Sequence, residues 1–432
     1  MELLTPAWTK FRPHPEQCKL WVSKERFVAV PAGRGSGKTE LAKRRLVRFL
    51  PIKKPHTTPR YFYGAPTVQQ ARRIAWDHFL QLIPKDWIEG EPNKTTLVIK
   101  TVFGSELHII GLDKPQRIEG DQWDGGVLDE SCDLHPGTFD RNIYPMLVHR
   151  NGWCWRIGVP KRHGPSATEF RKFFEAARAG EIEDATGFTW PSSDILPESA
   201  LRYAQQNMDV RDYREQFGAL WQSSGGVIFH GFNVEYNVRA CTYDSTRLII
   251  VGSDFNVDPM AWVLGHKYIM SNGQARMEWF DELYIRDTNT PATLNTLWQK
   301  YSSHEGGWAF YGDATGQARK TSASKSDYEW IFADKNFERA GRTIHYPKAN
   351  PARADRWATC NAMLLNGAGI RRMFIDPRCK HLIDDLKIRS QVVTDSHDIG
   401  HISDAMGYAV HYMFPIFGES QGTSEITIMA GS

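Results

Sequence analysis

A short glycine-rich segment constrains the fold of this chain more than any other feature. Residues 31–39 read Pro-Ala-Gly-Arg-Gly-Ser-Gly-Lys-Thr, follow an apolar run at residues 26–30 and precede a helical pattern at residues 38–50. Glycines in such a loop let backbone N–H groups turn toward phosphate oxygens, and the helix N-terminus adds partial positive charge. The segment therefore predicts a phosphate-binding loop, in a relaxed form because the strict motif has glycine in place of Ala32.

The polar side chains of this loop have expected tasks. Lys38 is expected to reach the β- and γ-phosphates of a nucleotide, and the Thr39 hydroxyl to ligate Mg²⁺. Further upstream, the amide of Gln17 is a candidate to read an adenine edge. The other loop residues expected to bind the nucleotide are Arg34, Gly35, Ser36 and Gly37.

A second apolar run ends in two carboxylates, Asp129 and Glu130. Asp129 is expected to hold Mg²⁺ through water, and Glu130 to activate the attacking water as a general base. The alternative is a solvated strand end, and the loop at Lys38 favours the catalytic interpretation. Hydrolysis also needs positive charge on the transferring phosphoryl group, for which Arg34 and Arg117 are candidates; a surface arginine is the alternative for each.

The order of predicted elements divides the chain in two. In the first half, strands at residues 26–30, 61–65, 127–129 and 154–159 alternate with helices at 38–50 and 68–82, and a hairpin is predicted at 95–110. Such alternation favours a parallel α/β sheet covered on both faces. Two helices (198–207 and 209–221) and a Ser/Gly run at 223–226 then mark a boundary. The second half predicts a separate α/β domain with a mixed sheet, from strands at 248–254, 261–268, 276–285, 308–313, 343–346 and 373–375 and helices at 291–302, 327–336, 352–365 and 402–413.

Three aspartates of the second half lie at the ends of predicted apolar strands or at the start of a predicted helix. Asp254 and Asp313 end predicted strands, and Asp404 begins a predicted helix. Convergent carboxylates repel each other, and Mg²⁺ or Mn²⁺ relieves that repulsion, because these cations prefer oxygen ligands. Two such ions would activate a water and stabilise the leaving oxygen in phosphodiester cleavage. For any one of these aspartates, a cap or turn former is the alternative.

Composition excludes several classes of protein. Across 432 residues, 53 Lys and Arg against 50 Asp and Glu give a net charge of +3, and 41% of residues are hydrophobic, which is typical of a globular protein and not of a disordered one. No apolar run approaches the roughly 18–20 residues of a membrane span, so no membrane partner is expected. Six cysteines without paired spacing predict reduced thiols in a cytosolic compartment and no zinc site.

Taken together, a nucleotide site followed by a metal-binding carboxylate set resembles the large subunit of the DNA-packaging terminase of tailed bacteriophages. The resemblance runs from about residue 15 to residue 412. It departs from the family at Val159, where a Thr or Ser usually precedes proline, so no coupling residue is assigned. The segments that carry the resemblance are residues 33–40, 64–76, 127–131, 158–160, 312–316 and 401–405.

The resemblance implies a fold and a set of roles. Its fold is α/β, with a P-loop ATPase of the additional-strand catalytic-glutamate type at residues 1–190, a helical lid and linker at 191–226, an RNase H-like nuclease with a mixed sheet at 227–417 and a flexible tail at 418–432. ATP and Mg²⁺ are the implied cofactors, with Mn²⁺ able to substitute in the nuclease. The resemblance implies catalytic roles for Glu130 and for Arg117, which resembles the family's arginine finger that acts on a neighbouring subunit. It implies metal binding in the nuclease by Asp254, Asp313 and Asp404.

The implied activity is a packaging cycle in the cytoplasm of the host cell. ATP hydrolysis translocates double-stranded DNA into a procapsid, and the nuclease cuts concatemeric DNA. The implied partners are DNA, a portal protein, a terminase small subunit and further copies of the chain in a ring of five. Two rival interpretations stay open: a translocase or helicase whose second half is a non-catalytic RNase H-like DNA-binding module, and a scaffold that holds ATP as a structural ligand.

Overall fold

The structure is a computed structural model that describes residues 7–56, 58–222, 226–318, 324–390, 399–414 and 426–430. The chain forms two compact units: the first comprises Met1–Leu201 and Tyr213–Ser224, and the second Arg202–Asp212 and Gly225–Ser432. The division therefore passes through two helices, α7 (Glu198–Asn207) and α8 (Val210–Gln216). No helix of the described residues is long and apolar enough to cross a membrane, and the six cysteines are free thiols.

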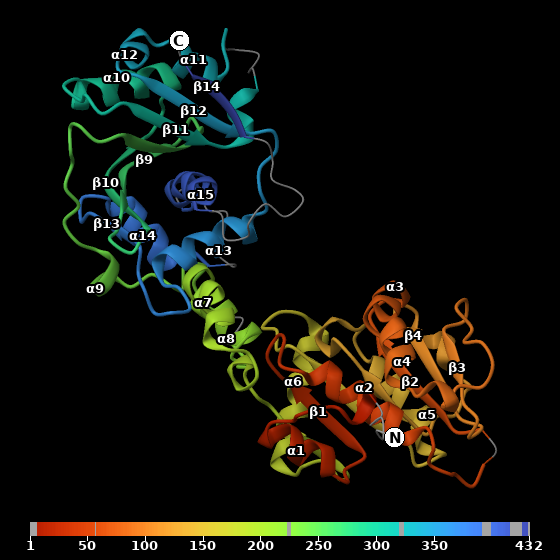
Figure 1. The fold of residues 1–432 in the computed structure, drawn as a ribbon. Coiled ribbons are helices and arrows are strands. Elements are labelled where there is room, and N and C mark those ends of the chain that lie inside the picture. Colours follow the sequence, from red (N-terminus) through yellow and green to blue (C-terminus); the bar gives the residue numbers. More distant parts are fainter. Residues whose placement is uncertain are drawn as a thin grey trace, which may run out of the picture. The chain divides into compact units, whose positions relative to one another are not determined.

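The first unit is built on a seven-stranded sheet in the order β3-β4-β2-β5-β6-β1-β7 (Figure 1). Adjacent strands are parallel except β3 and β4, which form the predicted antiparallel hairpin. The strands are β1 (Phe27–Pro31), β2 (Arg60–Ala65), β3 (Val98–Lys100), β4 (Glu106–Gly111), β5 (Gly125–Leu128), β6 (Trp153–Gly158) and β7 (Ala185–Gly187).

Helices cover both faces of this sheet because the central strands are apolar on both sides. On one face, α2 (Lys38–Phe49) buries Leu41 and Leu46 in the cluster that contains Trp155 of β6. On the other face, α6 (Pro165–Ala179) buries Phe170 against Ala29 of β1. The remaining helices of the unit are α1 (Pro15–Val22), α3 (Val68–Ala71), α4 (Asp77–Leu82), α5 (Tyr144–Val148) and two π-helical turns, Arg72–Trp76 and Thr138–Ile143.

The second unit has a seven-stranded mixed sheet in the order β13-β10-β9-β8-β11-β12-β14. Three consecutive strands, β8 to β10, are antiparallel, whereas β11 and β12 extend the sheet in parallel beside β8. The α/β class and the mixed sheet of the second half are thus confirmed. The strands are β8 (Ile249–Asp254), β9 (Met260–Ile269), β10 (Ala275–Ile285), β11 (Trp308–Gly312), β12 (Arg342–Pro347), β13 (Met373–Ile375) and β14 (Ile426–Ala430).

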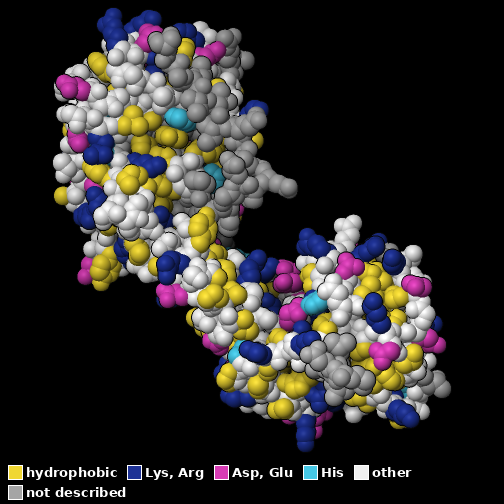
Figure 2. Space-filling view, in the orientation of Figure 1, with side chains coloured by type: hydrophobic (Ala, Val, Ile, Leu, Met, Phe, Trp, Pro, Cys, Tyr) yellow, Lys and Arg dark blue, Asp and Glu magenta, His cyan; other side chains and the backbone are white. Residues whose placement is uncertain are grey.

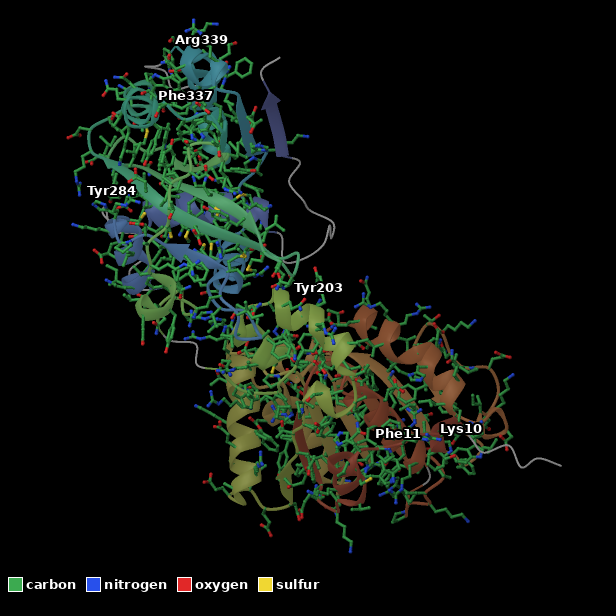
Figure 3. The ribbon with its side chains drawn as sticks, turned by 60° about the vertical axis from the view of Figure 1, so that its left-hand side comes forward. Lys10, Phe11, Tyr203, Tyr284, Phe337 and Arg339 are labelled. Carbon is green, nitrogen blue, oxygen red and sulfur yellow. The ribbon has the colours of Figure 1, made fainter. Side chains whose placement is uncertain are left out.

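Two groups of helices sandwich this second sheet (Figure 1). One group is α10 (Thr290–Tyr301), α11 (Asp327–Ala333) and α12 (Lys335–Arg339), from which Phe337 packs on Trp308 while Arg339 stays on the surface (Figure 3). The other group is α13 (Arg353–Leu364), α14 (Lys380–Ile388) and α15 (His401–Met413). The short helix α9 (Val234–Asn237) precedes β8 in the sequence. Charged side chains of both signs are interspersed over the face shown in Figure 2.

The structure contains helices that the sequence pattern did not predict, α6 and α14 among them, and it also changes several predicted elements. The predicted helix at residues 327–336 is two helices, because the Asp334 side chain accepts hydrogen bonds from the N–H groups of Asn336 and Phe337 and starts a new one. The predicted helix at 68–82 contains the π-helical turn Arg72–Trp76. The segment 418–432, predicted as a tail, contains β14, which pairs antiparallel with β12.

Candidate functional site

The predicted phosphate-binding loop connects β1 to α2, with its glycines in conformations that other residues avoid. Gly35 and Gly37 have φ angles of +70° and +73°, and Gly37 is the N-cap of α2. A Cβ on Gly33 would lie 2.4 Å from the Ser192 hydroxyl. The first helical hydrogen bond is donated by Leu41 to Gly37, so the N–H groups ahead of Leu41 in the first turn have no partner within the helix. The loop therefore presents N–H donors of the kind that can bind phosphate.

Side chains from distant parts of the first unit hold this loop in place. The Ser36 carbonyl accepts hydrogen bonds from Gln17 Nε2 (3.2 Å) and Trp190 Nε1 (2.9 Å). Ser192 Oγ donates to the Arg34 carbonyl (2.6 Å), and the Arg34 side chain is exposed. Gln17 Oε1 accepts from the His14 N–H (3.3 Å), so both ends of the Gln17 amide bond within the chain. In this structure Gln17 therefore braces the loop through its Nε2, and its proposed contact with an adenine edge stays a prediction.

Lys38 is buried beneath the loop. Its Nζ donates to the Gly33 carbonyl (3.3 Å), and the residue is only 7% exposed. Burial lowers the Lys38 pKa, while the negative charges of Asp129 and Glu130 oppose that change. The Ser36 hydroxyl is buried without a hydrogen-bond partner among the described residues. An ammonium group and a free hydroxyl beside helix N–H donors fit a bound triphosphate.

Asp129 lies directly after β5, at the sheet edge where the loop also begins. Its Oδ2 accepts from the Thr39 hydroxyl (3.0 Å) and from the Tyr63 hydroxyl (2.5 Å), and its Oδ1 accepts from the Glu130 N–H (2.8 Å). Burial and the Asp129 charge raise the Tyr63 pKa well above its usual value, so this phenol stays a donor. Tyr63, which the sequence analysis did not select, thus orients the carboxylate that faces Thr39.

Glu130 has a backbone conformation that a residue with a side chain rarely adopts. Its φ of 50° and ψ of 47° place it in the left-handed region, a strain that concentrates at functional sites. Burial, and then the charge of Asp129, raise the Glu130 pKa. A carboxylate with a raised pKa is a stronger proton acceptor, as a general base requires.

The candidate finger Arg117 lies on the 3₁₀ turn Pro115–Ile118. Its side chain is outside the described residues, so its direction is not assigned.

Val159, which follows β6, is buried at 5% exposure.

In the second unit, the topology brings the three aspartates to one end of the sheet. Asp254 ends β8 and Asp313 follows β11, and these two strands are adjacent and parallel. Asp404 lies in the first turn of α15, which packs directly on β8: a Cβ on Gly252 would lie 2.4 Å from the Ala405 carbonyl. Glycine at this position therefore lets α15 approach the strand.

Asp313 is buried, the Asp254 side chain is partly buried at 15% exposure, and each carboxylate has a spare oxygen atom. Asp254 Oδ2 accepts from Asn256 Nδ2 (3.1 Å) and lies 2.9 Å from His401 Nδ1. Burial raises the Asp254 pKa, and the charges of Asp404 and Asp313 add to this, while His401 opposes it. Asp313 Oδ2 accepts from the Thr315 hydroxyl, but Asp313 Oδ1 is buried without a partner in the described part of the chain. This orphaned oxygen fits a cation ligand.

Asp404 has a different environment, because two arginines bind it. Arg356 donates to Oδ1 (3.1 Å), and Arg389 donates to Oδ1 (3.1 Å) and Oδ2 (3.0 Å). Across the described residues, no group of three His, Cys, Asp or Glu side chains is arranged to hold a metal ion. The structure thus brings the three aspartates to one region, but only Asp254 and Asp313 offer free oxygens.

Comparison with known proteins supports the resemblance from the sequence. No family model matches the chain. The terminase large subunits of Thermus virus P23-45 and Thermus phage G20c are each 23% identical to it over 287 residues, which is 57% of this chain and 58% of the relative. The matched part therefore spans less than two thirds of these relatives. The resemblance to terminase large subunits is confirmed by these sequences.

Two solved structures are also similar. The large terminase of a thermophilic bacteriophage covers 94% of this chain and 100% of its own, at 13% identity and a TM-score of 0.49. The ATPase domain of the Thermus phage P74-26 large terminase covers 50% of this chain and 96% of its own, at 22% identity and a TM-score of 0.43.

Proposed function

We propose that this chain, a relative of phage terminase large subunits, is a genome-packaging motor subunit with two activities. The first unit hydrolyses ATP to translocate double-stranded DNA into a procapsid, and the second cuts concatemeric DNA. The observation that carries the proposal is the set around Asp129, whose carboxylate accepts from Thr39 of the phosphate-binding loop and from Tyr63, with Lys38 buried beside it. Under this proposal the first sheet is that of an additional-strand P-loop ATPase.

In the first unit, each residue has a defined task during hydrolysis. Loop N–H groups and Lys38 bind the phosphates, and Arg34 faces the solvent side of the loop. Thr39 and Asp129 hold Mg²⁺, which neutralises charge on the phosphate oxygens when bound. Glu130 accepts a proton from the attacking water, whose oxygen bonds to the γ-phosphorus as the bond to the ADP oxygen breaks. Arg117 of one copy of the chain stabilises the transferring phosphoryl group in the ATP site of a neighbouring copy.

In the second unit, the aspartates hold the metal for phosphodiester hydrolysis. Asp254 and Asp313 offer the free oxygens, and Asp404 is the third carboxylate of the RNase H-like set. Bound Mg²⁺ or Mn²⁺ supplies an activated water and charge stabilisation for the leaving oxygen. His401 holds the Asp254 carboxylate through their 2.9 Å contact, and this hydrogen bond raises the His401 pKa.

The proposed partners follow from the relatives rather than from any interface. Double-stranded DNA is the proposed substrate, and a portal protein and a terminase small subunit are the proposed protein partners. A homo-oligomeric ring, with five copies, supplies Arg117 to the adjacent ATP site. The proposed location is the host-cell cytoplasm.

A second candidate function has one specific observation in its favour. Because Asp404 is bound by two arginines and no three-residue metal group is formed in the described chain, the second unit fits a non-catalytic DNA-binding module of a translocase. The two functions differ in DNA cleavage and not in ATP hydrolysis.

Removing the Tyr63 hydroxyl tests the set around Asp129. In Tyr63→Phe, we expect the Mg²⁺ concentration for half-maximal ATP hydrolysis to rise roughly tenfold, because Asp129 loses the donor that orients it. The Mg²⁺ dependence of phosphate release measures this. Tyr61→Phe is the matched control, since Tyr61 is also buried on β2 but its hydroxyl has no hydrogen-bond partner among the described residues. An unchanged Mg²⁺ dependence in Tyr63→Phe contradicts the assignment.

The pH profile of hydrolysis tests the general base. Glu130 must be ionised to accept a proton, and its pKa is raised, so we expect kcat to fall with decreasing pH at a pH above the ordinary glutamate value of about 4.3. The charge of Lys161 lowers the Glu130 pKa, so Lys161→Met should move this acid limb to still higher pH. A profile that is flat down to a pH of about 4.5 in both proteins would rule out Glu130 as the base.

A further inference from the structure

The network around Asp404 is more extensive than a metal ligand requires. Both arginines are almost completely buried, with side-chain exposures of 4% for Arg356 and 1% for Arg389, against 19% for Asp404. Arg389 binds the carboxylate through two nitrogens, the fork geometry that gives the strongest carboxylate–guanidinium pairs. Two buried cations therefore share one carboxylate.

Other contacts fix both arginines in these positions. The guanidinium of Arg356 lies over the Tyr408 ring at 4.2 Å, and Arg389 also donates to the Gly400 carbonyl (3.1 Å) and the Ser403 hydroxyl (2.8 Å). The backbone of Arg389 is held as well, since its carbonyl accepts from the Ile228 N–H (2.8 Å). The arginines are thus held by their surroundings and are aimed at Asp404.

Charge explains why this arrangement matters for a cation site. Asp254 and Asp313 face each other's negative charge and have no arginine partner in the described residues. Asp404 instead pairs with two arginines, of which Arg389 also interacts with the buried Asp385 carboxylate. A divalent ion at Asp404 would lie beside two guanidinium groups, and like charges repel strongly in a partly buried site. Asp404 can bind a metal only after its ion pair with at least one of the two arginines is broken.

We propose that Arg356 and Arg389 are positioning residues that withhold Asp404 from the metal in the resting chain, so that Asp254 and Asp313 form the resting cation site. The metal part of this inference rests on the proposed nuclease function. The counter-ion part does not, because it concerns the chain without metal. Asp404 joins the site only when the Arg389 fork is released.

Thermal unfolding of the full chain in EDTA tests the counter-ion part. ADP is expected to bind the first unit and to raise the temperature at which that unit unfolds. The transition whose temperature does not change on addition of ADP is therefore assigned to the second unit. In Asp404→Asn this transition should fall by about 5–10 °C, because two buried guanidinium groups lose the carboxylate that both of them bind. In the matched variant Asp313→Asn it should stay or rise, because a buried carboxylate with an orphaned oxygen is removed. A transition in Asp404→Asn that is unchanged or higher overturns the proposal.

Mn²⁺ titration by calorimetry, without nucleotide, tests the metal part. Asp404→Asn should bind Mn²⁺ with wild-type affinity within about threefold, whereas Arg389→Met should bind several-fold more tightly because Asp404 is freed. The double variant Arg389→Met/Asp404→Asn should lose that gain. A loss of affinity of about tenfold or more in Asp404→Asn alone overturns the proposal. Absence of Mn²⁺ binding by the wild type overturns the metal part and the proposed nuclease, and leaves the unfolding result to decide the counter-ion role.

Discussion

We expect Glu130→Gln to lower kcat for ATP hydrolysis by about 10²–10⁴-fold and to leave ATP affinity close to that of the wild type. Glutamine keeps the size of the side chain and its polarity, but it cannot accept the proton of the attacking water. Neither Lys38, which is expected to bind the phosphates, nor Thr39, which is expected to ligate Mg²⁺, is changed. Phosphate release under saturating ATP measures the loss, and binding of a fluorescent ATP analogue measures the affinity.

The control for this variant is the next carboxylate along the chain. Asp133 lies on the turn Ser131–Asp133, is partly exposed and is paired with Lys161 Nζ at 2.5 Å. Asp133→Asn should therefore hydrolyse ATP within about twofold of the wild type, since exposed pairs contribute little. Hydrolysis by Glu130→Gln at the wild-type rate would mean that another group takes the proton.

Under the proposed function, we expect Asp313→Asn to lower metal-dependent DNA cleavage by at least about 10²-fold and to leave ATP hydrolysis intact. Asp313 is 5% exposed, and its Oδ1 has no protein partner in the described residues, so the carboxylate charge is available to a cation. An amide of the same shape keeps the Thr315 contact but gives up this charge. Nicking of supercoiled plasmid in Mn²⁺ measures the loss.

Asp384→Asn is the matched control in the second unit. Asp384 lies on α14, its side chain is 66% exposed, and it pairs with Lys387 of the same helix at 3.3 Å. Cleavage by this variant should equal that of the wild type. If Asp313→Asn cleaves DNA like Asp384→Asn, the aspartates are structural and the translocase with a DNA-binding module becomes the better account.

Local signals were sufficient to predict most of the elements that position both sites. The strand before the loop, the helix that begins at Lys38 and the strand that ends before Asp129 all follow from apolar runs and glycine positions within the sequence. The same holds for β8 and β11, which place Asp254 and Asp313. Apolar runs bounded by turn residues report burial directly, so these elements could be found without their neighbours.

The residues that the sequence analysis missed all act through partners far away in the chain. Tyr63 and Asp129 are 66 positions apart, and Arg356 and Asp404 are 48 apart. A buried tyrosine or arginine needs a polar partner, but periodicity does not reveal which one. The sequence alone therefore predicted a metal-binding role for Asp404, whereas the structure shows that two arginines bind it.

The central claim is that one chain carries two separate chemistries, ATP hydrolysis in the first unit and DNA cleavage in the second. The most direct test measures both activities, on the same preparations, for the wild type, Glu130→Gln and Asp313→Asn, with plasmid in Mn²⁺ and an EDTA control. The account predicts that the wild type has both activities, that Glu130→Gln keeps only cleavage, and that Asp313→Asn keeps only ATP hydrolysis. Cleavage that survives in Asp313→Asn or in EDTA, or a wild type that hydrolyses ATP but cuts no DNA, would contradict it.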